Sequence, residues 1–392
     1  MASPADGHAA ARFVTQRTAA PAGRIDAIQA LRAIAVIIVV AYHLTVLFPN
    51  PHEARWAVPA PLYFGYAGVD LFFVLSGFII THVTRRDPFD PREFAAKRVV
   101  RILPLYWLVT TIILALWLIR PGMVDIRADS ALRYIVDSYL LLPTPERPLL
   151  GVGWTLEHEF QFYALIGILL TLGMRRFAVP ALLILFAIGI ALHVVIDPDS
   201  AQFWDWKLFS LYSFQFALGI IAYRINQRWR LRHAWVGIAA GVILFIATAW
   251  IATPLMNQER EVTVVAAGAF GLVRTIGYGV ASFVLTLGVL ALPAAQDMER
   301  TAVGRSVMLI GDASFSIYLF HNLVLQTIAL VTRRMSVDAA FAAAIAAMII
   351  VILSGIALHR LLERPLLKYL EARIMPTLLG HRPSTSTMAA RR

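Results

Sequence analysis

Two ionisable side chains, Arg32 and His43, interrupt the first long apolar run of the sequence. Eleven positions separate them, close to three helical turns, so on a helix they share one face. Histidine titrates near neutral pH and is the side chain that most often removes a proton from a reacting hydroxyl group. The spacing therefore indicates His43 as a candidate general base, although a hydrogen bond to a neighbouring helix would also explain a buried histidine.

Six more polar side chains lie within apolar runs that are long enough to be helices: Asp70, Ser76, Glu157, Glu159, Tyr163 and His321. A carboxylate such as Asp70 can orient an imidazole, but it can equally pair with an internal base such as Arg32. Glu157 and Glu159 fall in the first turns of their helix, where the helix dipole favours carboxylates whatever their function. His321 has a similar alternative, a hydrogen bond between helices.

Arg98 and Arg101 are one helical turn apart at the start of the third apolar run. Two guanidinium groups on one face can clamp the phosphates of a donor such as acyl-coenzyme A, although the rule that places Lys and Arg on the cytoplasmic side explains them equally. The chain has no cysteine and no Gly-x-Ser-x-Gly motif, so direct acyl transfer to a hydroxyl is favoured over a covalent acyl-enzyme. We expect no metal, because no His, Asp and Glu set has close ligand spacing.

The composition indicates the surroundings of these residues. Of the 392 residues, 59% are apolar and 15% are charged, against roughly a quarter charged in soluble domains. Too few polar residues are present to cover a soluble protein of this size, so a lipid bilayer must surround most of the chain. The net charge of +11 is better explained by cytoplasmic loops than by nucleic acid, which we do not expect as a partner.

A membrane-spanning helix needs about 20 mostly apolar residues. This rule predicts an all-α bundle of ten spans at 28–48, 62–83, 100–119, 155–173, 177–196, 208–225, 234–252, 275–293, 309–331 and 338–361. Of the 35 Lys and Arg residues, 23 would then lie on the side of the two termini, which predicts that both termini are cytoplasmic. The membrane domain is predicted to cover 24–373, between disordered cytoplasmic tails at 1–23 and 374–392.

Two segments outside these spans are also predicted to contact the membrane. Residues 131–142 are expected to form an amphipathic helix on its surface, and residues 262–274 are expected to be re-entrant or interfacial, with Arg274 in an outer loop. The predicted depths put His43, Asp70 and Glu159 in the outer half of the bilayer, and Arg98 and Arg101 at its inner side. This separation suits an anionic donor held in the cytoplasm and a reaction nearer the far face.

Six strings, in order along residues 24–366, resemble the motifs of the membrane acyltransferase family 3. They are RIDAIQALRAIAVIIVVAYH with Arg32 and His43, YAGVDLFFVLSGFII with Asp70 and Ser76, FAAKRVVRILPLYW with Arg98 and Arg101, GWTLEHEFQFY with Glu159, GDASFSIYLFH with His321, and LLERP with Glu363. Each string is only moderately specific, but six in register make a chance match unexpected. Members of this family O-acylate sugars of exopolysaccharide, lipopolysaccharide and peptidoglycan, and also macrolides.

The resemblance implies a ten-helix fold, acyl-CoA as the donor and His43 as the base. It implies Arg98 and Arg101 as donor contacts, to which we add Arg32, and it favours Glu159 over Glu157, although both acids occur in the motif. Asp70 is grouped with the catalytic candidates. Acetyl is the family's commonest donor group, so acetyl-CoA is the expected co-substrate.

We therefore predict an O-acyltransferase of the inner or plasma membrane that acylates a hydroxyl of a sugar in a cell-envelope or exported glycan. The sequence lacks the soluble esterase-like domain that some relatives append, so the enzyme is expected to be self-sufficient or to work with a separate glycan-assembly partner. Two alternatives stay open: acylation of a small molecule such as a macrolide, and a transporter or flippase without covalent chemistry. The Gly-rich stretch 268–279 is the best hint of the broken helix that a transporter would need.

Overall fold

The computed structural model describes residues 25–47, 64–85, 88–119, 130–143, 147–195, 209–229, 231–256, 268–332 and 337–379. Within these ranges the chain is helical and contains no β-strand. The predicted tail 1–23 lies outside the described residues. The helical part of the chain extends through Met375–Leu378, beyond the predicted end of the membrane domain at 373, and residues 380–392 again lie outside the description.

Each of the ten predicted spans overlaps an observed helix. These helices are α1 (Asp26–Leu47), α3 (Gly68–Val83), α4 (Pro91–Ile119), α6 (Trp154–Thr171), α7 (Ala178–Val195), α8 (Ser213–Arg228), α9 (Ala234–Met256), α10 (Gly268–Ala291), α12 (Ser314–Thr332) and α13 (Val337–Leu358). Among the described residues, 7 helices are long and apolar enough to cross a membrane, or 8 if the bent pair formed by α11 (Ala302–Asp312) and α12 is one span. The all-α membrane architecture is thus confirmed.

α6 and α8 do not pass the same test of length and apolar character. α8 has only 16 residues, and α6 opens with the polar sequence Trp-Thr-Leu-Glu-His-Glu. The polar side chains of the two helices, among them Glu157 and His158 of α6 and Gln215 of α8, are nevertheless buried between helices rather than exposed to lipid. That the two helices cross the membrane, and that both termini are cytoplasmic, stay predictions.

Among the differences from the predicted boundaries, three matter most for the fold. α4 begins at Pro91 rather than at residue 100, because Pro favours the first helical position and the Asp90 carboxylate accepts hydrogen bonds from the backbone N–H groups of Arg92 and Glu93. The predicted span 309–331 is bent by 71° between α11 and α12. A side chain at Gly311 would lie 2.2 Å from the backbone oxygen of Gln29, so only glycine allows α11 to approach α1 here.

The third difference concerns the expected re-entrant piece at 262–274. α10 is helical from Gly268, so residues 268–274 are its first two turns and Arg274 belongs to this helix rather than to an outer loop. Residues 262–267 lie outside the described residues. The surface helix predicted at 131–142 is confirmed as a helix, α5 (Ala131–Leu140), which Ser130 caps at its N-terminus.

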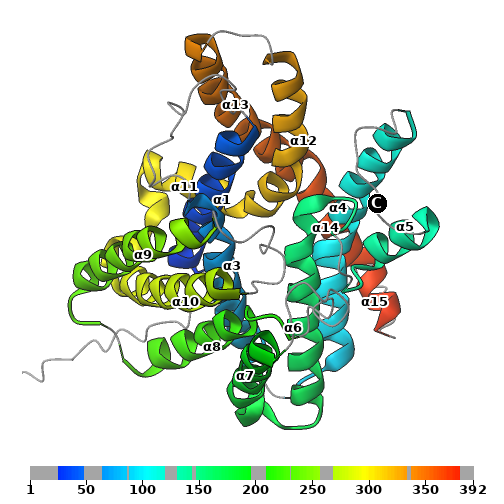
Figure 1. The fold of residues 1–392 in the computed structure, drawn as a ribbon. Helices are drawn as coiled ribbons and strands as arrows, with labels where there is room; N and C mark the ends of the chain where they lie inside the picture. Colours follow the sequence, from blue (N-terminus) through cyan, green and yellow to red (C-terminus); the bar gives the residue numbers. More distant parts are fainter. Residues whose placement is uncertain are drawn as a thin grey trace, which may run out of the picture.

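α1 and α3 stand at the centre of the bundle, with α9 and α10 on one side and α4 and α6 on the other (Figure 1). α12 and α13 pack on each other, and α10 packs on α9. Glycines allow the closest crossings: a side chain at Gly77 of α3 would lie 2.2 Å from the backbone oxygen of Phe216 in α8, and one at Gly237 of α9 would lie 2.9 Å from Gly288 Cα in α10.

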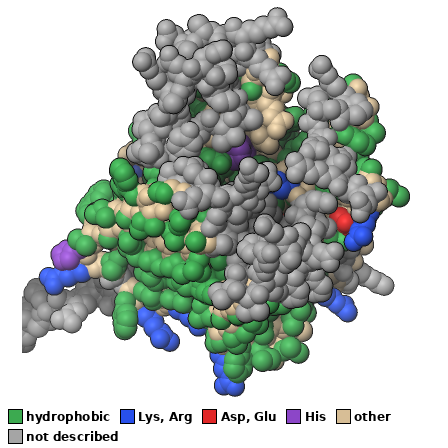
Figure 2. All heavy atoms as spheres, in the orientation of Figure 1, with side chains coloured by type: hydrophobic (Ala, Val, Ile, Leu, Met, Phe, Trp, Pro, Cys, Tyr) green, Lys and Arg blue, Asp and Glu red, His purple; other side chains and the backbone are tan. Residues whose placement is uncertain are grey.

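The described part of the outer surface suits a lipid environment. Among the described side chains in Figure 2, most are hydrophobic, and most of the visible Lys and Arg lie along the lower edge. The exposed large side chains of α9 include Trp235, Val236, Ile243 and Trp250, each more than half exposed. Such a surface would aggregate in water but is ordinary against lipid.

Candidate active site

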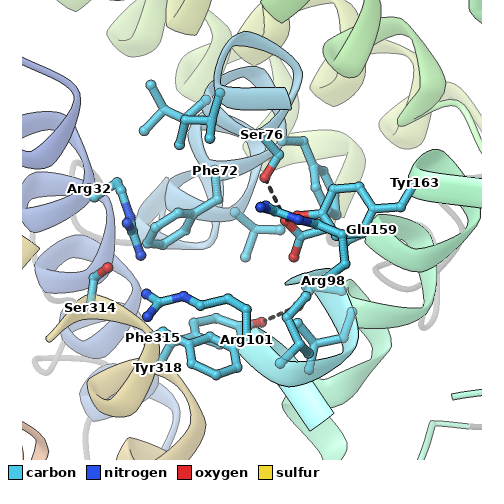
Figure 3. A pocket seen from close by; sticks show the side chains of 17 residues that line it. Arg32, Phe72, Ser76, Arg98, Arg101, Glu159, Tyr163, Ser314, Phe315 and Tyr318 are labelled. Carbon is cyan, nitrogen blue, oxygen red and sulfur yellow. Dashed lines mark hydrogen bonds between the residues drawn. The ribbon is translucent and has the colours of Figure 1, made fainter. Parts of the chain in front are cut away.

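One internal cavity, with a volume of about 160 Å³, lies between α1, α3, α4, α6 and α12. Six of the ten candidate residues line it: Arg32, Ser76, Arg98, Arg101, Glu159 and Tyr163. They come from four helices, α1, α3, α4 and α6. Figure 3 shows Arg32 and Arg101 reaching into this cavity from different walls, close to Ser314. We call it the arginine cavity.

α4 supplies two of the three guanidinium groups because Arg98 and Arg101 are one turn apart on the same face. The Arg98 guanidinium carbon lies 5.8 Å from the centre of the Tyr163 ring and 6.0 Å from that of Phe94. Stacking on these rings holds a planar cation in place without neutralising it. Arg101 instead forms an ion pair with the carboxylate of Glu363, at 2.9 Å.

Glu159 is the carboxylate of the arginine cavity. It accepts a hydrogen bond of 2.9 Å from the Ser76 hydroxyl of α3, and another from the hydroxyl of Tyr163. These bonds join α3 to α6 and fix the carboxylate opposite the guanidinium groups. Glu157, only two positions earlier and therefore on another face of α6, is buried but does not line the cavity.

His43 and His321 lie together, with ring centres 4.7 Å apart, but outside the set of lining residues. His321 is three positions after Tyr318, which does line the cavity, so the imidazole pair lies about one turn of α12 beyond the cavity wall. His43 Nδ1 donates to the Val39 carbonyl at 2.9 Å. Because a carbonyl only accepts hydrogen bonds, the neutral ring keeps its free lone pair on Nε2, which is the form a general base needs.

Asp70 is not in the arginine cavity. Its carboxylate accepts hydrogen bonds from Nη2 of Arg274 at 3.0 Å, from Nε of Arg274 at 3.2 Å and from Gln215 Nε2 at 2.6 Å. The Arg274 guanidinium also lies over the rings of Tyr66 and Tyr212, at 4.9 and 5.3 Å. Both charged side chains are at most 1% exposed. This closed pair is the alternative explanation of Asp70 that the sequence left open, although with Arg274 rather than Arg32.

Sequence reasoning missed two residues of these clusters as site members. Arg274 could have been found by the rule that singled out Arg32, since it also interrupts an apolar run, but the run 262–293 was too long to be placed as one helix. Glu363 was noted only as a motif residue. In the structure its side chain is 1% exposed and contacts Arg101 directly.

Together, the fold and the cavity define a helical membrane protein with an internal site where positive charge exceeds negative charge. The acyltransferase domain family matches residues 25–360, and the chain belongs to this family, acyltransferase family 3. It is therefore an enzyme that transfers acyl groups to hydroxyl oxygens.

Several characterised proteins are similar in sequence. The exopolysaccharide production protein ExoZ of Rhizobium meliloti is 32% identical over 325 residues, which cover 79% of this chain and 92% of that protein. The peptidoglycan O-acetyltransferase OatA of Listeria monocytogenes is 28% identical over 188 residues, and O-acetyltransferase OatA of Staphylococcus aureus is 29% identical over 192 residues. The matched regions cover 28% and 30% of these two longer proteins. No solved structure matches the chain.

Proposed function

We propose that this O-acyltransferase moves an acetyl group from acetyl-CoA to a hydroxyl of a sugar in an exported or cell-envelope glycan. The observation that carries the proposal is the convergence of three guanidinium groups, from Arg32, Arg98 and Arg101, on one cavity that also holds a carboxylate. Guanidinium groups bind phosphate through a fork of donors, and coenzyme A carries several phosphate oxygens.

A second cavity, of about 470 Å³, gives the donor a way in. It lies where α3 ends and α4 begins, and its lining includes Arg85, Lys97 and Arg98, together with His82, Asp90 and Glu93, of which Glu93 forms an ion pair with Lys97. Arg98 lines both cavities. A donor could hold some of its phosphate groups among these residues and the others beside the guanidinium groups of the arginine cavity, with its thioester end in that cavity. Because this end of α4 is predicted to be cytoplasmic, the donor would come from the cytoplasm of a cell with an inner or plasma membrane.

In the proposed reaction, His43 Nε2 takes the proton of the acceptor hydroxyl as its oxygen attacks the carbonyl carbon of the thioester. The carbon–sulfur bond breaks, the acyl group stays on the acceptor oxygen, and the leaving thiolate receives the proton back from His43. Atoms and charges balance without a metal or an acyl-enzyme. The guanidinium groups would bind the donor and offset the negative charge that develops on the carbonyl oxygen.

The relatives support a glycan as the acceptor. The Rhizobium protein is described by its role in exopolysaccharide production, and the match extends over nearly its whole length. The two longer relatives are described as O-acetyltransferases, one of them acting on peptidoglycan. A sugar hydroxyl as the acceptor is compatible with each of these descriptions.

The test uses the full chain in membrane vesicles with acetyl-CoA labelled in its acetyl group. We expect release of coenzyme A together with label in an ester of the cell's own exported glycan, detected by mass spectrometry and removed by mild alkali. Cells without the protein should lack that ester. Movement of an unmodified solute across the vesicle membrane, without any acetyl transfer, would contradict the proposal and favour a transporter.

A further inference from the structure

Glu363 is a buried carboxylate on which three helical segments converge. Its Oε2 atom accepts a hydrogen bond of 2.6 Å from the Ser316 hydroxyl of α12 and contacts His359 Nδ1 at 2.8 Å. Its Oε1 atom forms the ion pair of 2.9 Å with Arg101 of α4. Glu363 itself does not line the arginine cavity, whereas Arg101 does. The carboxylate therefore acts on the cavity only through Arg101.

The backbone around Glu363 departs from a regular α-helix. After α13 the chain forms a π-helical turn over His359–Glu363 before α-helix resumes at Arg364. One extra residue in a turn rotates the next helical segment by about 100°, because each residue of an α-helix accounts for that angle. The turn thus sets the direction in which Glu363 points, towards α12 and α4. π-turns inside helices are frequent at functional sites.

The two members of the ion pair differ in freedom. The side chain of Glu363 is 1% exposed, while that of Arg101 is 34% exposed. The carboxylate is also held by two further contacts, from Ser316 and His359, whereas the Arg101 guanidinium has beside this ion pair a looser contact with the Phe315 ring, 5.9 Å from its centre. The carboxylate is therefore the more firmly held member of the pair. A long Arg side chain that is free to rotate loses conformational entropy when it binds a ligand, and an anchor reduces that cost in advance.

We propose that Glu363 is a positioning residue that holds Arg101 in the orientation that receives the acyl donor. The inference rests on the proposed function, since it assumes that Arg101 contacts acetyl-CoA. In this role the Glu363 carboxylate, held by Ser316 and His359, belongs to the donor site although it does not contact the donor. Loss of the carboxylate should weaken donor binding while the acceptor's KM stays unchanged.

The experiment measures KM for acetyl-CoA and kcat with the full chain in membranes. Glu363→Gln keeps the shape and one hydrogen bond but removes the charge, and we expect KM for acetyl-CoA to rise about tenfold with a smaller change in kcat. The matched control is Glu371→Gln, which changes an exposed glutamate in the next π-helical turn and should leave both constants unaltered. Equal KM values for the two variants would overturn the proposal.

A double-mutant cycle separates positioning from general packing. If Glu363 acts through Arg101, adding Glu363→Gln to Arg101→Ala should raise KM no further. An equal rise in both backgrounds would mean that Glu363 acts independently, and would overturn the proposal. Should Glu363→Gln fail to fold, Ser316→Ala removes one of the anchor's contacts and should raise the same KM by a smaller factor; an unchanged KM there would also count against it.

The outcome also separates this inference from the proposed function. A wild-type protein that neither binds nor consumes acetyl-CoA would overturn the proposed function, and the role of Glu363 with it. If the wild-type protein consumes acetyl-CoA and the Glu363→Gln variant has the same KM for acetyl-CoA, only the proposed role of Glu363 is overturned.

Discussion

The arginine cavity and the Asp70–Arg274 pair contain the same kinds of side chain in opposite arrangements. Asp70 and Arg274 neutralise each other, are at most 1% exposed and are enclosed by Tyr66 and Tyr212. The arginine cavity brings together three guanidinium groups with one lining carboxylate, and Arg101 remains 34% exposed. A charged group inside a membrane protein is a functional candidate by default, but the balance and exposure of its neighbours decide which kind of function it serves.

The largest effect is expected where the chemistry is proposed, at His43. His43→Ala should lower the rate of acetyl transfer by about 10² to 10⁴-fold, which is the usual contribution of a general base. The measurement is turnover of labelled acetyl-CoA in membranes, with the amount of inserted protein checked separately. His233→Ala, which changes an exposed histidine before α9, is the control and should retain turnover. Normal transfer by a properly inserted His43→Ala protein would refute the mechanism.

The second prediction tests whether the Asp70–Arg274 pair stabilises the fold, as its burial indicates. Arg274→Ala leaves the buried Asp70 carboxylate without its countercharge, so it should destabilise the protein by about 3–5 kcal/mol. Thermal unfolding in detergent measures this loss. Arg300→Ala, which removes the partner of Asp297 in an exposed pair, should leave the unfolding temperature nearly unaltered.

The same pair can be tested by replacing both of its charges. The double variant Asp70→Leu with Arg274→Met should unfold at a temperature much closer to that of the wild type than Arg274→Ala does, since well-packed apolar side chains often replace a buried ion pair at little cost. Retained acetyl transfer in this double variant would show that Asp70 is structural. Complete loss of transfer in a stable double variant would instead return Asp70 to the catalytic candidates.

The third prediction tests whether Arg98, in contrast to Arg274, serves donor binding rather than stability. Arg98→Ala should raise KM for acetyl-CoA by about 10- to 100-fold, the effect of losing one charge-assisted contact, with little change in unfolding temperature. Arg92→Ala, an exposed arginine of the same helix, serves as the control. A large loss of stability with an unchanged KM would place Arg98 in the structural class with Arg274.

The smallest effect is expected at Ser76. Ser76→Ala removes one of the hydrogen bonds that the Glu159 carboxylate accepts, and a bond to a charged group contributes about 1.5–3 kcal/mol. Because Tyr163 still donates to the same carboxylate, we expect most of this to be compensated and turnover to fall by only a few-fold. Steady-state kinetics at saturating acetyl-CoA detect this change. An effect as large as that of His43→Ala would mean that the serine itself takes part in the reaction.

Hydropathy and motifs were sufficient to predict the ten helices and six of the residues that line the arginine cavity. The length of an apolar run depends only on local composition, and Arg32, Arg98 and Glu159 each lie at a recognisable position in such a run. The pairing of Asp70 with Arg274 could not be predicted in this way, because the two residues are 204 positions apart and the position of α10 was uncertain.

The irregularities of the backbone also could not be predicted from the sequence. The bend between α11 and α12 interrupts a continuous apolar run, and next to it Gly311 lies close to the backbone of another helix. The direction of Glu363 depends on a π-helical turn, whereas any periodicity argument assumes 3.6 residues per turn. The relation of His43 to the cavity likewise depends on how α1 and α12 pack, which is a property of the assembled bundle.

The position of α3 limits the substitutions that this enzyme can accept. It carries Ser76 on the wall of the arginine cavity and Asp70 in the closed pair, and beside Ser76 its Gly77 rests against the backbone of α8. Because the helix is rigid over this length, a side chain added at position 77 would displace both groups together. The Ser76 hydroxyl and the Asp70 carboxylate are thus mechanically linked, and a substitution that adapts the cavity wall to a new acceptor must leave the closed pair in place.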